Sequence, residues 1–317
     1  MSELATIIFS VFGLIGIGYV SARSGLLADT VGTGLADFVF TVAIPVLLFR
    51  TLATADFAGA SPWALWATYF SAVAVTWFLS HKVIRVAFGR DARSGVVAGV
   101  SASFANTVLV GIPLVQTFLG DQGMVALLII LSIHLPVMML ASVLLFEWAL
   151  RADGVDADPV PFGHLIRRLA VSLARNPIII GIVAGGIWRL GGFPLTGIFA
   201  RIVDSLAQVA GPMALFAAGM GLASYGIARN VPQALVITAF KLAVMPAIVL
   251  TIGSLIGLPQ IFLAAAVITA GCPTGVNAYL IASRFGTGQA ISSNAMTLST
   301  VLGTITMGLW VAVVGIA

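Results

Sequence analysis

Runs of 18 or more apolar residues recur along the whole of this chain and leave only short polar stretches between them. A helix of that length crosses the hydrocarbon layer of a bilayer, which is roughly 30 Å thick. Apolar residues make up 60% of the 317 residues and charged residues only 8%, so there are too few charges to cover a water-soluble domain. These runs predict an all-α polytopic membrane protein.

Ten membrane spans account for the apolar runs. The polar stretch 151–175 separates five spans in the first half from five in the second. The spans cover residues 4–22, 34–54, 62–88, 94–119, 122–150, 177–190, 197–228, 232–255, 259–285 and 288–315. We interpret the first run as a span rather than a cleaved signal, because no basic residue precedes it.

The distribution of Lys and Arg predicts how the spans are oriented. If the N-terminus lies outside, eleven of the fifteen basic residues fall on the cytoplasmic side. They are Arg23, Lys82, Arg85, Arg90, Arg93, Arg151, Arg167, Arg168, Arg175, Arg229 and Arg284. With ten spans, both termini are then expected outside.

Matched residues recur at a nearly constant spacing in the two halves. They are Arg23 and Arg189, Asp37 and Asp204, Pro45 and Pro212, and Asn106 and Asn277, at offsets of 166, 167, 167 and 171. Since each half has an odd number of spans, the second copy must enter the membrane upside down. Two inverted five-helix repeats of this kind are typical of secondary transporters, whose binding site lies near the midplane.

Two stretches place polar residues, glycine and proline inside otherwise apolar spans, the fourth and the ninth. The first runs from Ser101 to Pro113 and the second from Cys272 to Tyr279. Pro113 lacks a backbone donor and its ring presses on the carbonyl four residues back, so the helix is expected to kink or open near 110–112. Opened backbone in a membrane is tolerated only where protein or a watery cavity satisfies it, so each break is a candidate ligand site.

Asn106 and Asn277 are the leading candidates for substrate binding. At a break near the midplane, each amide offers donors and an acceptor, and the N-terminus of the following half-helix adds a positive dipole end. This combination suits an organic anion. The alternative is that each asparagine only ties off the broken backbone of its own helix. The breaks add further expected contacts, namely Thr107, Pro113, Pro273 and Thr274.

Two ionisable side chains lie inside predicted spans. Lys241 is about ten residues into the eighth span, where an ammonium costs roughly 2.5–3.5 kcal/mol to insert. It is expected either to compensate the charge of an anion or to pair with backbone carbonyls. His134 is expected to line the pocket or to titrate between about pH 5 and 8, the alternative being a hydrogen-bonded histidine of the core.

Other classes of protein have less support. Cys272 is the only cysteine, which excludes an internal disulfide and a thiolate metal cluster. No cofactor or metal ion is expected. No nucleic-acid partner is expected either, because the basic residues lie between the spans rather than in one patch. Coupling to Na⁺ or H⁺ is left open. An intramembrane hydrolase that uses Ser101 and His134 is a remote alternative.

Pairs and triplets of glycine are expected at close helix contacts. Gly13, Gly16 and Gly18 follow no predicted strand, so they indicate helix packing rather than a dinucleotide site. The same role is expected for Gly95, Gly99, Gly181 and Gly185.

Five short motifs occur in order across nearly the whole chain. They are Phe38-Val-Phe-Thr-Val-Ala-Ile-Pro45, Asn106-Thr-x4-Ile-Pro113-Leu, Leu145-Phe146-Glu147, Lys241-x4-Pro246-Ala and Pro273-x3-Asn277-x-Tyr279. In these motifs the chain resembles the auxin efflux carrier family, which includes bacterial organic-acid carriers and the plant PIN-formed auxin exporters. The resemblance implies that Asn106 and Asn277 contact the ligand, with Tyr279 close by.

The resemblance also implies a division into two helix bundles. A scaffold would comprise residues 1–60 and 176–230 and form a homodimer, and a transport bundle would comprise 61–150 and 231–317. Residues 151–175 would be a cytoplasmic loop. The broken fourth and ninth helices would cross, and the transport bundle would move against the scaffold in an elevator-type cycle in a bacterial inner membrane.

A secondary carrier of small organic anions is therefore the expected function, with mono- or dicarboxylates or auxin-like acids as substrates. His134 stands where plant members of the family carry a pocket glutamine. That departure and the short central loop argue against plant auxin itself.

Overall fold

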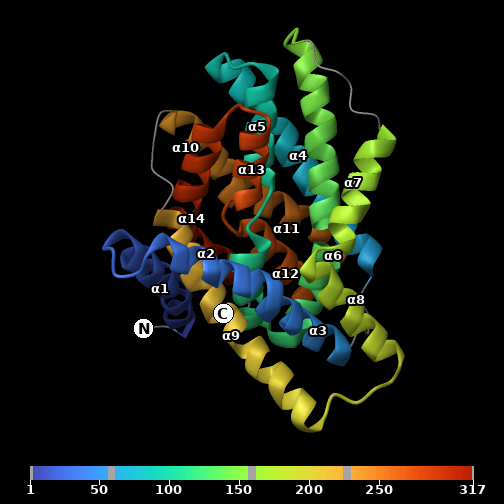
Figure 1. The fold of residues 1–317 in the computed structure, drawn as a ribbon. Helices are drawn as coiled ribbons and strands as arrows, with labels where there is room; N and C mark the ends of the chain where they lie inside the picture. Colours follow the sequence, from blue (N-terminus) through green and yellow to red (C-terminus); the bar gives the residue numbers. More distant parts are fainter. Residues whose placement is uncertain (1–2, 56–60, 156–161, 224–229, 316–317) are drawn as a thin grey trace.

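The computed structural model describes residues 3–55, 61–155, 162–223 and 230–315 (Figure 1). These residues form helices and contain no β-strand, only an isolated bridge between Ala105 and Thr274. The elements, with η for π-helical turns, are α1 (Glu3–Arg23), α2 (Asp29–Phe38), η1 (Val39–Ala43), α3 (Ile44–Thr54), α4 (Pro62–Phe88), α5 (Ala92–Ser103), η2 (Thr107–Gly111), α6 (Ile112–Ala152), α7 (Phe162–Ala174), α8 (Pro177–Leu190), α9 (Gly197–Ala223), α10 (Val231–Ala239), η3 (Phe240–Val244), α11 (Met245–Ile256), α12 (Gln260–Gly271), α13 (Val276–Arg284) and α14 (Gln289–Val313). Arg229 and the side chain of Arg168, both counted in the orientation argument, lie outside this description.

Seven helical runs within the described ranges are long and apolar enough to cross a membrane. They are Thr6–Arg23, Asp29–Thr54, Pro62–Phe88, Thr107–Ala152, Gly197–Ala223, Val231–Ile256 and Gln289–Val313. The apolar helices α8 and α12 are shorter, with 14 and 12 residues. The predicted class, an all-helical polytopic membrane protein, is confirmed.

Both polar interruptions open the helices that contain them. α5 ends at Ser103, and helical structure resumes only with η2; α12 ends at Gly271, and helical structure resumes with α13. We call the intervening residues, 104–106 and 272–275, the crossing, because the two segments pair with each other as described below.

The first opening lies a few residues earlier than the position predicted from Pro113. Residues 107–111 form a π-helical turn, in which the Asn106 carbonyl accepts hydrogen bonds from Val110 N (3.3 Å) and Gly111 N (3.0 Å). This wider turn leads into α6, where Pro113 occupies one of the first two positions and needs no backbone donor. The helix therefore departs from regular α-helix at 107–111, next to the predicted position, but it opens earlier, at 104–106.

α6 covers 41 residues but is kinked at Gly120, whose φ of 57° and ψ of −153° are not helical. Only glycine adopts this conformation readily. The bend divides 112–119 from 121–152, close to the predicted end of one span at 119 and start of the next at 122. Within the polar segment 151–175, which is expected to connect the two halves, residues 162–174 form α7. Its Leu, Ile, Ala and Arg residues favour a helix without a span-length apolar run.

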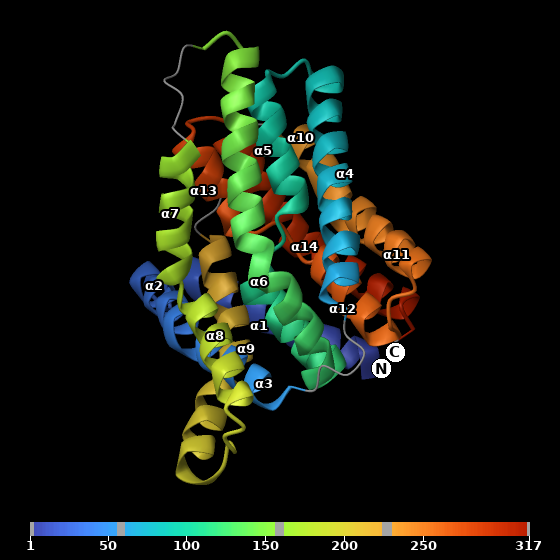
Figure 2. The same cartoon turned by 90° about the vertical axis from the view of Figure 1, so that its right-hand side faces the viewer.

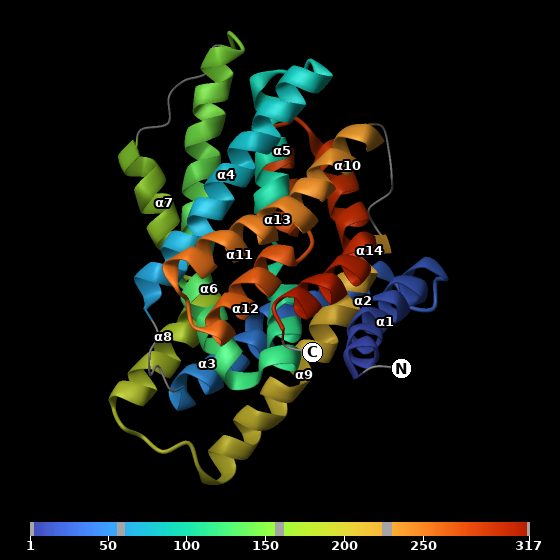
Figure 3. The same ribbon diagram turned by 180° about the vertical axis from the view of Figure 1, so that it is seen from behind.

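The helices lie in two groups, and the crossing belongs to the second of them, which contains α5 and α12. In Figure 2, α2, α8 and α9 lie on the left and α4 and α11 on the right, with α5 and α6 between them. Figure 3, from behind, shows α4, α11 and α12 covering the face opposite α2 and α3. In the first group α1 packs along α9 and α3 along α8; in the second α4 packs along α5 and α11 along α12.

Glycines permit the closest of these helix contacts. A Cβ atom at Gly18 would lie 2.2 Å from the Phe216 carbonyl oxygen of α9, and one at Gly219 would lie 2.0 Å from the Ile15 carbonyl oxygen of α1. Close contacts of the same kind occur at Gly95, Gly99, Gly181 and Gly185. Nothing lies within 4 Å of a Cβ at Gly13 or Gly16, so the packing role predicted for those two is wrong. They lie on the same helix as Gly18 but do not face α9.

The end of α6 is bonded to the start of α5 through Asp153. Its carboxylate accepts hydrogen bonds from Ala92 N (2.8 Å) and Arg93 N (3.1 Å), and from the Arg93 guanidinium (3.0 Å). Asp91 caps the same helix by accepting from Ser94 N at 2.8 Å. Burial by itself would raise the pKa of Asp153, but these donors hold the pKa below its ordinary value of 3.8.

Replacing Asp153 with asparagine should therefore destabilise the fold in a pH-dependent way. Because the folded-state pKa is depressed, the carboxylate contributes its full stability above pH 3.8 and loses it as the pH falls further. At pH 7 the melting temperature of Asp153→Asn in detergent should fall by a few degrees, since charge-assisted bonds contribute about 1.5–3 kcal/mol. The difference from the wild type should narrow below about pH 4. Asp121→Asn, at an exposed position, is the control; equal melting temperatures at pH 7 would contradict this role.

Candidate functional site

The two interrupted helices are hydrogen bonded to each other at the crossing. Asn106 N donates to the Pro273 carbonyl at 2.7 Å, and Gly275 N donates to the Phe104 carbonyl at 2.8 Å. These bonds flank the antiparallel bridge between Ala105 and Thr274. Ala105 is 2% exposed and Thr274 is 0% exposed. Each broken helix thus supplies the partners that the other needs inside the membrane.

Hydroxyl groups around Thr274 complete the hydrogen bonding of the crossing. Thr274 N donates to Ser299 Oγ at 2.9 Å, and Thr274 Oγ1 donates to the Ser101 carbonyl at 2.8 Å. Ser101 Oγ lies 3.1 Å from Ser292 Oγ. Thr274 therefore holds the crossing together, and the Ser101 hydroxyl is bonded to Ser292 rather than to His134.

Lys241 is buried behind the crossing. Its side chain is 0% exposed, donates a hydrogen bond to the Ala270 carbonyl, and lies 3.5 Å from the sulfur of Met245. Ala270 is in the last turn of α12, where the carbonyls lack the donors that a continuing helix would provide. Of the two roles expected for Lys241, pairing with a backbone carbonyl is the one observed. It lines none of the three cavities described next.

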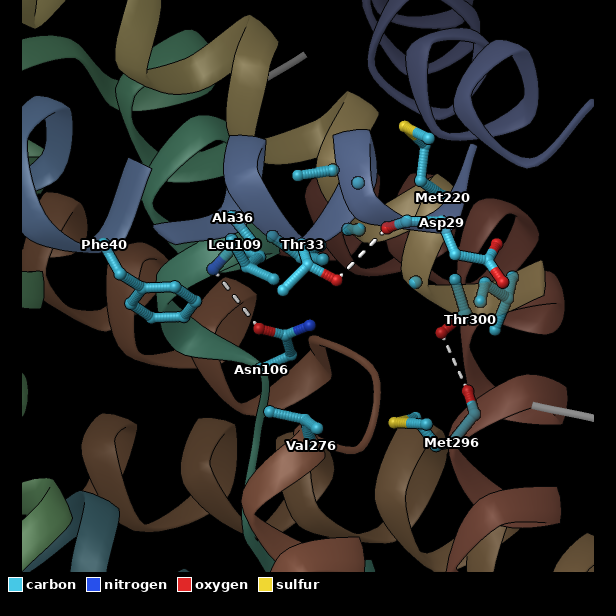
Figure 4. Close-up of a pocket in the computed structure, with 16 residues that line it drawn as sticks. Asp29, Thr33, Ala36, Phe40, Asn106, Leu109, Met220, Val276, Met296 and Thr300 are labelled. Carbon is cyan, nitrogen blue, oxygen red and sulfur yellow. Dashed lines mark hydrogen bonds between the residues drawn. The ribbon is translucent and has the colours of Figure 1, made fainter. Parts of the chain in front are cut away.

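The first cavity lies beside Asn106 and has a volume of about 300 Å³ (Figure 4). Asn106 Oδ1 accepts a hydrogen bond from Leu109 N at 3.2 Å and so caps η2, while the amide nitrogen points away from Leu109. Residues of α2, η1, α9, α13 and α14 form the other walls, among them Asp29, Thr33, Phe40, Met220, Val276, Met296 and Thr300.

The second cavity lies beside Asn277 and has a volume of about 200 Å³. Val276 and Asn277 are the first residues of α13, so their N–H groups belong to the turn that has no partner within the helix. The positive end of the helix dipole acts at the same point. The other residues that line the second cavity include Phe40, Phe104, Thr107, Val108, Leu131, His134, Leu135, Asn176 and Pro177. Phe40 and Val276 line both cavities.

His134 lines the second cavity and is unusual because its ring nitrogens are buried without hydrogen-bond partners in the part of the chain that the structure describes. The side chain is 1% exposed, and neither ring nitrogen has a hydrogen-bond partner among the described residues. Its ring packs against Tyr69, Phe70 and Phe104, with centroid distances of 5.5, 6.2 and 5.1 Å. The alternative of a hydrogen-bonded core histidine is not what the structure has.

The third cavity, of about 480 Å³, contains Pro113 instead of either asparagine. It is lined by α1, α3, the start of α6 and α9, with polar groups from Arg50, Gln116 and Gln208. Arg50 Nε donates to Asp204 at 2.5 Å, which joins α3 to α9.

The predicted site residues are thus distributed around the crossing rather than in one pocket. Pro273 and Thr274 build the crossing, Asn106 lines the first cavity, and Thr107, His134 and Asn277 line the second. Tyr279 lines none of the three cavities.

The sequence reasoning missed three polar or aromatic wall residues. Phe40 lies within the Phe38–Pro45 motif, which could have indicated it. Asn176 precedes Pro177, a common helix-start pattern, and its side chain accepts from Ile178 N at 2.9 Å. No sequence signal marked Asp29, which joins the site only through tertiary packing.

The chemistry of these walls suits an anion better than a metal ion. Two helix N-termini, two amides and one imidazole supply donors, and Asp29 of the first cavity is the only carboxylate among the wall residues of the first two cavities. Within the described residues, no group of three His, Cys, Asp or Glu side chains could hold a metal ion.

Comparison with known proteins places the whole chain beside transporters. The sequence pattern of the family described as "Membrane transport protein" matches residues 4–311. A protein of Rhizobium meliloti named "Putative malonate transporter" is 26% identical over 97% of this chain and 94% of its own length. An "Uncharacterized transporter" of Methanothermobacter thermautotrophicus is 24% identical over 96% of each chain.

Proposed function

This chain belongs to the Membrane transport protein family, the auxin efflux carrier family of its sequence motifs, and on that premise we propose that it is a secondary carrier of small organic anions. Membership makes the protein a membrane transporter rather than an enzyme. The substrate class, the site and the mechanism are our proposal.

The crossing carries the assignment. It holds two opened helices together in a buried position, and each outgoing half-helix begins with an asparagine that faces a cavity. Asn106 and Asn277 donate to substrate carboxylate oxygens, and the N-termini of η2 and α13 offset the negative charge. Lys241 adds a fixed positive charge from behind the crossing. Asn106 also caps its own helix, the alternative role considered for it. Its amide oxygen accepts from Leu109 N, which leaves the amide nitrogen to donate to substrate.

The size and polarity of the cavities favour short carboxylates. The two cavities, of about 300 and 200 Å³, share Phe40 and Val276 as wall residues, and each has its own amide and helix N-terminus. A short dicarboxylate can therefore place one carboxylate at either amide. The name of the Rhizobium meliloti relative makes malonate the first compound to test, with monocarboxylates and auxin-like acids as further candidates.

The architecture behind this site is proposed to be ten spans in two inverted repeats. The bridged residues Ala105 and Thr274 are 169 positions apart, within the 166–171 spacing of the matched residues. An antiparallel bridge is itself two-fold symmetric, as an inverted duplication requires. The bend at Gly120 divides α6 into two spans, and the pairs α1–α9 and α3–α8 exchange under the same operation.

Transport would follow from movement of one helix group against the other. Residues 1–60 and 176–230 form the scaffold, through which two copies associate, and 61–150 and 231–317 form the moving bundle. Segment 151–175 connects the two halves on the cytoplasmic side, and both termini lie on the outer side of the inner membrane. The crossing belongs to the moving bundle, while Asp29 and Phe40 belong to the scaffold, so the cavities lie where the two groups meet.

Uptake into proteoliposomes tests the proposed function. Vesicles containing the purified protein should accumulate labelled malonate faster than protein-free vesicles, and unlabelled dicarboxylates should compete. A panel of mono- and dicarboxylates and aromatic acids then ranks the substrates. If no organic anion in that panel enters faster than in protein-free vesicles, the proposed function is wrong.

A further inference from the structure

Among the described residues that line the second cavity, His134 is the one whose side-chain polar atoms are fully buried and have no hydrogen-bond partner. The side chain is 1% exposed, and among the described residues neither nitrogen has a partner. Leaving a buried polar group unsatisfied costs about 1–3 kcal/mol. Such a group calls for an explanation, and at the wall of a cavity a bound ligand can supply the missing partner.

The surroundings of the ring define which ligand could supply it. Three aromatic rings hold the imidazole in place, and its cavity also contains Asn277, Thr107 and the first turn of α13. Those groups donate hydrogen bonds to an anion. A carboxylate bound there would therefore lie in the same small cavity as the unpartnered nitrogens.

The ionisable groups near His134 are few. Tyr69 of α4 packs against the ring, and Lys241 of η3 is close enough to interact with it electrostatically. Cys272 interacts in turn with Tyr69 and Lys241 and donates to the Ile268 carbonyl. Among the residues that line the second cavity, α8 and α13 contribute no titratable side chain, and no carboxylate is present.

We propose that His134 takes up one proton with each substrate carboxylate, so that the protein is a proton–anion symporter. This inference rests on the proposed function and names its coupling ion. The proton comes from water on the side where substrate enters, binds a ring nitrogen, and forms an imidazolium–carboxylate pair. It returns to water on the other side when the carboxylate leaves, so no bond to the substrate forms or breaks.

Lys241 makes this proton dependent on the substrate. A second positive charge beside its ammonium is repelled in a low-dielectric interior, whereas a carboxylate in the cavity attracts it. A bound carboxylate favours protonation of His134, so by linkage the protein binds the carboxylate more tightly when His134 is protonated. The proton and the anion therefore cross together, and neither crosses readily alone.

The decisive experiment counts protons against malonate. Vesicles that contain the protein and a trapped pH indicator are given labelled malonate at pH 7.5, and uptake and internal acidification are measured together. The wild type should carry about one proton per malonate. His134→Gln, which keeps a hydrogen-bonding side chain but cannot pair as a cation with the carboxylate, should take up malonate more slowly and with at least a tenfold smaller proton signal per malonate. His81→Gln is the matched control, because His81 lies on α4 outside the three cavities; it should keep the wild-type ratio.

A second measurement uses only the wild-type protein. Malonate binding in detergent, followed calorimetrically in buffers of different ionisation enthalpy, should reveal uptake of about one proton per bound malonate. Malonate uptake without acidification, no proton uptake on binding, or an unchanged ratio in His134→Gln would each overturn the inference and leave the carrier intact. Absence of uptake of every acid tested would instead remove the proposed function, and the symport inference with it.

Discussion

Replacing Asn106 and Asn277 together with alanine is expected to lower malonate uptake by more than about 100-fold. Each amide donates to a charged carboxylate, and such bonds contribute about 1.5–3 kcal/mol each. The measurement is initial uptake of labelled malonate into proteoliposomes that contain equal amounts of correctly folded wild-type and variant protein.

Asn106→Asp with Asn277→Asp separates binding from folding in this experiment. Aspartate keeps the oxygen that accepts from Leu109 N at 3.2 Å, and a negative charge at the first turn of α13 suits the helix dipole. The aspartate variant should therefore melt close to the wild type yet fail to transport, because it repels the anion. Wild-type uptake by either double variant would exclude the asparagines from the site.

Substituting Gly219 with alanine is expected to open the contact between α1 and α9. The added Cβ would lie 2.0 Å from the Ile15 carbonyl oxygen, a backbone atom that cannot rotate away. Overpacking of this kind costs about 1–3 kcal/mol, so the melting temperature in detergent should fall by about 2–10 °C.

Gly221→Ala is the matched control on the same helix. Nothing lies within 4 Å of a Cβ at Gly221, and alanine favours a helix more than glycine does by up to about 1 kcal/mol. This variant should be as stable as the wild type or more so. If the two variants melted alike, the close packing of α1 on α9 would not be a source of stability.

The class of fold and the two interruptions could be predicted because local physics determines them. Span-length apolar runs leave few alternatives to membrane helices. The segments Ser101–Pro113 and Cys272–Tyr279 contain polar residues, glycine and proline, which are poorly suited to a continuous membrane helix. The kink at Gly120 falls between the predicted span boundaries at 119 and 122, where glycine lets the helix turn.

The rest depends on contacts between segments that are distant in the sequence. Sequence reasoning placed Pro113 in the site, whereas a π-helical turn directs it to the third cavity. It could not determine that Asn106 and Asn277 face separate cavities, because pairing at Ala105 and Thr274 sets the rotation of both helices. Glycine spacing alone likewise could not tell Gly18, which contacts α9, from Gly16, which does not.

The central claim, that an organic anion binds at the crossing, is tested most directly by protecting a cysteine placed there. Val276 lines both cavities, and the native Cys272 is buried, so a charged thiol reagent should label Val276→Cys selectively. Malonate should slow this labelling, whereas it should leave labelling of Ser283→Cys, at an exposed position on the same helix, unchanged. Labelling of Val276→Cys at the same rate with and without malonate, in protein that transports malonate, would contradict the account.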